Sequence, residues 1–128
     1  EWLDPLMTAG HWLPELVAMA GGVDGLGRAG EDSPRVPWEE VRRYDPDVML
    51  IMPCSFAISR TVKEFPLLAQ RPGWPCVSAV RTGRVFAVDG SLFHRPGPRL
   101  VQGLKLMAAL FHPGLFPKPP AAHAKALS

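Results

Sequence analysis

A continuous apolar run at residues 48–52 (VMLIM) constrains the fold of this chain more than any other stretch. Asp-Pro-Asp stands directly before it, and a proline stands directly after it. A short run that is apolar on both faces and bounded by breaking residues is typical of a strand buried on both faces of a mostly parallel sheet. Parallel strands need long crossover connections, which are usually helices. The run therefore predicts an α/β fold.

Helical patterns and short strands alternate along the rest of the chain. Strands are predicted at residues 1–3 and 84–88, helices at 12–20, 37–44, 57–70 (kinked at Pro66) and 98–112, a helical turn at 76–82, and at most one short strand at 23–26. This order predicts a three-layer α/β sandwich with a mostly parallel sheet flanked by helices. Residues 1–116 are expected to form this unit. Residues 117–128, rich in proline and alanine, are expected to form a flexible tail.

The composition argues against several classes of protein. The 128 residues include 14 basic and 12 acidic side chains, a formal net charge of +2, and the basic residues are scattered. A nucleic-acid partner is therefore not expected. No apolar run approaches the roughly 20 residues of a membrane helix. Cys54 and Cys76 match no zinc-binding spacing and could form at most one disulfide; free buried thiols are expected. The sequence opens within a strand, with neither an initiator methionine nor a signal segment, so we expect a piece of a longer protein.

Catalytic motifs are absent from the sequence. It has no Gly-x-Ser-x-Gly elbow and no glycine-rich phosphate loop, and its glycines at 21, 22, 25 and 27 do not form the dinucleotide fingerprint after a strand. Its paired carboxylates are sequence neighbours in polar stretches rather than groups that would face one another across a pocket. We therefore do not expect an enzyme.

Three loops, at residues 4–11, 53–57 and 89–97, are predicted to leave the carboxyl ends of strands. Because those ends meet at one edge of a parallel sheet, the loops are expected to converge there. Their residues would give that edge an apolar, aromatic rim with a few polar and cationic groups: Trp2, Met7, His11, Cys54, Phe56, Phe93, His94 and Arg95. Such a rim is typical of a small-molecule surface. The alternative is a solvated connection whose arginines only aid solubility.

Four segments together resemble a known family. They are residues 1–16 (EWLDP, AGHW and PEL), 36–48 (VPWEEV and DPDV), 84–90 (RVFAVDG) and 95–100 (RPGPRL). In order and spacing they resemble the second lobe of helical-backbone substrate-binding proteins of metal-chelate ABC importers, and especially the cobalamin-binding group. The resemblance extends to about residue 113.

The resemblance implies a fold and a set of roles. Two α/β lobes joined by a long helix would hold the ligand between them, and this chain would be the carboxyl-terminal lobe without its amino-terminal partner. The loop at residues 92–95 would contact a corrinoid, with Arg95 among the contacts, and Trp2 and Met7 would add apolar contacts. Glu39 would dock the lobe on an arginine pocket of the permease. The location would be periplasmic, or extracytoplasmic and membrane-anchored. From the residues alone, Glu39 is a carboxylate favoured at a helix start.

Alternatives remain for individual residues and for function. His11, His94 and Cys54 could coordinate a metal, or a histidine could be an axial ligand to a corrinoid cobalt or a haem iron. If they bind no metal, His11 is a residue at a helix start, His94 is an exposed polar contact and Cys54 is a small core residue. The chain could also carry haem or a ferric siderophore, or be a stand-alone ligand-sensing or metal-dependent enzyme domain. No covalently bound cofactor is expected. Without the other lobe, exposed Trp2, Met7, Phe56 and Phe93 would favour self-association.

Overall fold

The computed structural model of the protein describes residues 1–127. In chain order its elements are β1 (Trp2–Leu3), β2 (Leu6–Met7), α1 (Leu13–Met19), α2 (Trp38–Tyr44), β3 (Met49–Ile51), α3 (Ile58–Glu64), α4 (Pro66–Ala69), the 3-10 turn η1 (Trp74–Cys76), α5 (Ser78–Arg81), β4 (Val85–Val88), the 3-10 turn η2 (Gly90–Leu92), α6 (Arg99–Phe111) and β5 (Ala124–Leu127). The predicted helices are all present, and the helix predicted at 57–70 divides at Pro66 as expected.

The central sheet has three strands in the order β3-β4-β5. Strand β3 runs parallel to β4, with Met49 opposite Val85 and Ile51 opposite Ala87, whereas β5 runs antiparallel to β4. Strands β1 and β2 form a separate antiparallel hairpin. The strand expected at 23–26 does not form, because that segment is held in turns, and the Asp24 side chain accepts from the backbone N–H groups of Leu26 and Gly27.

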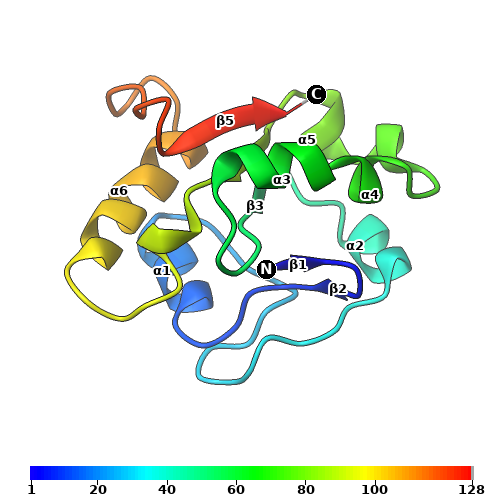
Figure 1. Ribbon diagram of the computed structural model, residues 1–128, viewed down its shortest axis with the longest axis horizontal. Coiled ribbons are helices and arrows are strands. Elements are labelled where there is room, and N and C mark those ends of the chain that lie inside the picture. The colour runs from blue at the N-terminus through cyan, green and yellow to red at the C-terminus, as the bar shows by residue number, and fades with distance from the viewer. Residues whose placement is uncertain (128) are drawn as a thin grey trace.

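Helices cover both faces of the sheet, which gives the three layers predicted from the sequence. One hydrophobic cluster joins β3 and β4 to α2, α4 and η1 and includes Ile51, Val85, Trp38, Leu68 and Trp74. The other cluster joins the opposite sheet face to α1 and α6 and includes Met52, Val88, Leu13, Leu16, Leu106, Met107 and Leu110. In Figure 1, α1 and α6 lie to the left of β3, and α2 and α4 lie to the right. The alternation along β3 and β4 assigns successive side chains to opposite clusters.

The prediction of a flexible tail at residues 117–128 is wrong for residues 124–127. This segment forms β5, which pairs along the whole of β4, from Val85 opposite Leu127 to Val88 opposite Ala124. The segment carries alanines and one lysine, with little strand propensity of its own, and the free edge of β4 supplies its partner. Leu127 is buried in the cluster of α2, α4 and η1.

Candidate functional site

The loops that follow β3 and β4 are bonded to each other at the carboxyl edge of the sheet. The Nε2–H of His94 donates to the carbonyl oxygen of Met52 at 2.8 Å. A carbonyl oxygen only accepts, so the proton must be on Nε2. The ring also fills the space above Gly90, where an added Cβ would lie 2.7 Å from the His94 ring. His94 thus connects the two loops, and its Nε2 is not free for a ligand.

Phe93 lies inside the protein, and its prediction as an outward ligand contact is wrong. Its side chain is fully buried in the cluster of α1 and α6. The turn η2, capped by Asp89, directs the chain so that Phe93 packs on Gly103 of α6. The Phe93 carbonyl oxygen accepts the indole Nε1–H of Trp12 at 2.6 Å, and this bond ties the loop before α1 to the loop after β4.

An aromatic pair joins the first loop region to the loop after β3. The rings of Trp2 and Phe56 meet edge to face with centroids 5.3 Å apart. The guanidinium of Arg60 lies 3.8 Å from the centroid of the Phe56 ring, and its Nε–H donates to Glu64 at 3.1 Å. Phe56 is buried and Trp2 is half-buried. Arg60 was not predicted from the sequence; its spacing of four residues after Phe56 is the signal that could have found it.

The residues considered for metal binding do not meet. Among residues 1–127, no group of three or more His, Cys, Asp and Glu side chains is placed to hold a metal ion. His94 is engaged with Met52, and exposed His11 faces Asp32 with 3.9 Å between Nδ1 and Oδ1. Cys54 and Cys76 are free thiols, but the prediction that they are buried is wrong, because both are exposed. The alternative in which these three donors together hold a metal is therefore not met by the geometry of residues 1–127.

Arg95 remains the cationic group available at this edge. It is exposed, and it forms no hydrogen bond or ion pair with any of residues 1–127. Met7 is half-buried in β2. Since Phe56 and Phe93 are buried, the predicted exposed patch of four apolar side chains is reduced to the half-exposed Trp2 and Met7. Self-association through this edge stays a prediction.

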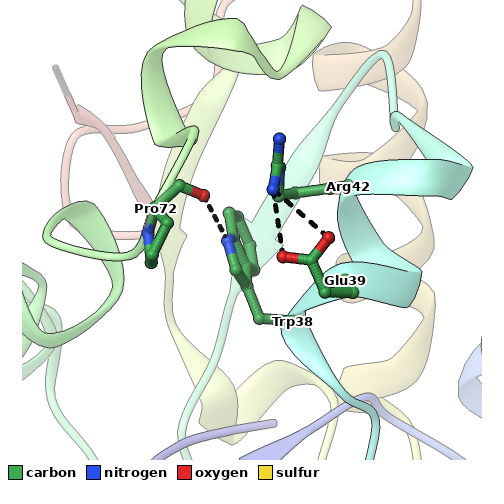
Figure 2. Close-up of polar contacts among 4 residues, drawn as sticks. All are labelled: Trp38, Glu39, Arg42 and Pro72. Carbon is green, nitrogen blue, oxygen red and sulfur yellow. Dashed lines mark hydrogen bonds and ion pairs between the residues drawn. The ribbon is translucent and has the colours of Figure 1, made fainter.

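Glu39 lies on a separate face, at the start of α2. Its neighbour Trp38 is buried, stacks on Trp74 and donates its indole Nε1–H to the carbonyl oxygen of Pro72 at 2.7 Å. This anchor fixes the first turn of α2 and leaves the Glu39 side chain 67% exposed. As Figure 2 shows, Arg42 donates to both carboxylate oxygens, at 3.0 and 3.2 Å. Glu39 is thus an oriented surface carboxylate with an internal counter-ion.

The carboxylate at the end of α2 has a lowered pKa. Asp45, in the left-handed conformation, accepts from the backbone N–H and the hydroxyl of Ser78, both at 2.7 Å. These hydrogen bonds lower the pKa of Asp45 below its ordinary value, because they favour the charged form. The contacts join the end of α2 to the start of α5.

One hollow of the protein shares part of its lining with the predicted ligand edge. It is a groove of about 660 Å³ beside β3, and its lining includes Trp2 and Met7 but not Phe56, Phe93, His94 or Arg95. Its walls are mainly apolar side chains of α1, α2 and α6. Reasoning from the sequence did not find this groove, because segments far apart in the chain line it.

The protein is similar to transport proteins of one family. A family profile described as periplasmic binding protein matches residues 4–92. The chain is 32% identical, over 76 residues, to an uncharacterized ABC transporter substrate-binding lipoprotein, YvrC, of Bacillus subtilis (strain 168). That match covers 59% of this chain and 24% of the relative, so the chain spans about a quarter of its length.

Two solved structures have a similar fold. One is the TroA-like periplasmic binding protein FepB from Veillonella parvula, with a TM-score of 0.61 and 21% identity; 83% of this chain matches 34% of that one. The other is a periplasmic solute-binding protein from Veillonella parvula DSM 2008, with a TM-score of 0.59 and 21% identity; 84% of this chain matches 33% of that one. Within residues 1–127, no helix has the length and apolar character needed to cross a membrane.

Proposed function

The chain belongs to the periplasmic binding protein family, and we propose that it forms the carboxyl-terminal lobe of the solute-binding component of an ABC importer. The mechanism is capture of a small molecule between this lobe and an amino-terminal lobe, followed by docking on a permease. No bond is made or broken in the ligand. The location is extracytoplasmic, as the family and the lipoprotein relative suggest.

The observation that carries the proposal is that two hydrogen bonds hold the loop that presents Arg95. His94 fixes the loop after β4 to the loop after β3, and Trp12 fixes it to the segment before α1. Exposed Arg95 comes directly after Phe93 and His94, the two residues that make these hydrogen bonds. Its guanidinium, free of internal partners among residues 1–127, can donate to a carboxylate or amide of the ligand. A braced loop loses little conformational entropy when it binds.

The ligand class is a metal chelate, with a corrinoid first and haem or a ferric siderophore as alternatives. Trp2 and Met7 supply half-exposed apolar surface for a flat, largely apolar ligand. We do not propose His94 as an axial ligand, because Nε2 is bonded to Met52. His94 and buried Phe93 act instead as supports of the loop, and Phe56 supports Trp2.

The test is a titration of the intact two-lobe protein with hydroxocobalamin and, separately, with haemin, read by absorption and calorimetry. Saturable binding is expected, and Arg95→Ala should weaken it by roughly 1–3 kcal/mol, about 5- to 150-fold. Arg43→Ala, at an exposed arginine of α2, is the matched control and should leave the affinity unchanged. If neither compound binds, neither is the ligand. If Arg95→Ala and Arg43→Ala lose the same amount of affinity, Arg95 is not part of the site.

A further inference from the structure

The guanidinium of Arg60 is held near Trp2, one of the proposed ligand contacts. Its Cζ lies 3.8 Å from the centroid of the Phe56 ring, and its Nε–H donates to Oε1 of Glu64 at 3.1 Å. The Phe56 ring in turn meets the Trp2 ring edge to face, with centroids 5.3 Å apart. A single aromatic ring therefore connects Arg60 to the half-exposed indole of Trp2.

The turn after β3 and the first turn of α3 place this group. The backbone N–H of Phe56 donates to the carbonyl oxygen of Pro53 at 3.1 Å, and Ser55 between them has a left-handed φ of 64°. The Phe56 ring is buried, so it is a fixed surface for the guanidinium. Residues four apart are neighbours on a helix surface, which brings Glu64 beside Arg60. The side chain of Arg60 is thus held from two sides.

The two terminal amino groups of Arg60 are available as donors. Within the described chain, the guanidinium makes its contacts through Nε and through one face. The side chain is 59% exposed. Arginine presents its terminal N–H groups as a planar fork that suits oxygen acceptors. Since the ring and the ion pair already restrict this side chain, it loses less rotamer freedom when it binds an acceptor.

The carboxylate of Glu64 decides which acceptor suits this fork. Its side chain is 34% exposed, and its negative charge offsets the positive charge of Arg60. A ligand carboxylate on the same guanidinium would lie close to the Glu64 carboxylate, and the like charges would repel each other. A neutral carbonyl oxygen can accept the same hydrogen bonds without that repulsion. The pair therefore favours a neutral acceptor.

We propose that Arg60 donates to an amide carbonyl oxygen on the rim of the ligand, beside Trp2, and that Glu64 selects an amide-bearing chelate over a carboxylate-bearing one. This inference rests on the proposed function and narrows its ligand class. A corrinoid ring carries amide side chains, whereas haem carries two propionate carboxylates. Arg60 contacts the ligand, and Glu64 sets the charge of that contact.

The test is titration of the intact two-lobe protein and its variants with hydroxocobalamin and, separately, with haemin. Arg60→Ala should raise the Kd for hydroxocobalamin about tenfold, through loss of a hydrogen bond from a charged donor. Glu64→Gln keeps an acceptor for Arg60 and removes the negative charge. It should strengthen haemin binding about fivefold and change hydroxocobalamin binding less than about twofold. Lys63→Ala, at an exposed cation of the same helix, is the matched control and should leave both affinities unchanged.

The outcomes separate this inference from the proposed function. If Arg95→Ala weakens hydroxocobalamin binding and Arg60→Ala does not, Arg60 is no ligand contact, and this inference alone is overturned. If Glu64→Gln gains no affinity for haemin, Glu64 does not select the ligand, and the proposed selectivity is overturned. If the parent protein binds neither compound, the proposed ligand class fails and the inference fails with it.

Discussion

The Nε2–H of His94 donates to the carbonyl oxygen of Met52, and this 2.8 Å bond joins the loops that leave two neighbouring strands. The two residues are 42 positions apart in the sequence, and the parallel pairing of β3 with β4 brings them together. The bond holds the segment that leads to Arg95 against the end of the sheet. The bond therefore supports the loop that presents Arg95, the proposed ligand contact.

Replacement of His94 should loosen this edge. His94→Ala removes the donor to Met52 and the ring above Gly90, and we expect the free energy of unfolding to fall by about 1–3 kcal/mol. Urea denaturation measures the change. His11→Asn is the control, since His11 is exposed in the left-handed conformation that asparagine tolerates, and its effect should stay within about 0.5 kcal/mol. Equal stability of the two variants would contradict a supporting role for His94.

Gly103 is required by the burial of Phe93. A Cβ at this position would lie 2.7 Å from the Leu92 carbonyl oxygen and 2.8 Å from the Phe93 ring. We expect Gly103→Ala to lower the free energy of unfolding by about 1–3 kcal/mol, because the overpacking outweighs the higher helix propensity of alanine. Gln102→Ala, at an exposed position of the same helix, should be neutral or slightly stabilising. Thermal unfolding followed by circular dichroism compares the two, and a stabilised Gly103→Ala would refute the packing argument.

Asp45 should contribute stability that depends on pH. Its pKa is lower in the folded protein than the ordinary value of 3.8, because Ser78 donates two hydrogen bonds to the charged carboxylate. The unfolded state therefore binds the proton more readily, and the contribution is present above about pH 4 and lost as the pH falls through the folded-state pKa.

Asp45→Asn isolates this contribution, since asparagine also adopts the left-handed conformation. Urea denaturation of both proteins between pH 2 and 7 should show a difference in the free energy of unfolding that is largest at neutral pH and shrinks in acid. A difference that stays constant over this range would show that ionisation of Asp45 does not matter.

Glu39 should govern docking on the permease, if the proposed function holds. Glu39→Gln in the intact protein should weaken binding to the permease in nanodiscs about tenfold, chiefly through slower association, and the effect should shrink in high salt. Glu40→Gln is the matched control, because Glu40 is the adjacent exposed carboxylate in the same helical turn. If both variants bind like the parent protein, docking does not involve this turn.

The sequence predicted the candidate site only in part. Phe93 and Phe56 were expected at the surface with Trp2, since all three are apolar residues in loops at strand ends. Sequence position does not reveal side-chain direction in a loop: Phe93 turns inward because Gly103, ten residues later, leaves space for its ring. Arg60 and the groove beside β3 escaped prediction for a similar reason, since both depend on contacts between distant segments.

The sequence by itself determined the layers of this protein, because local apolar spacing and breaking residues fix where helices and strands begin and end. The run at 48–52, the division of the helix at Pro66 and the three-layer arrangement all followed from it. Only the tertiary structure decided which edges of the strands are paired and which loop side chains turn inward. The edge of β4 pairs with the weak strand at residues 124–127, His94 bonds to Met52, and the Phe93 ring packs on Gly103. These outcomes depend on backbone groups and space supplied by segments far apart in the chain, about which a local pattern carries no information.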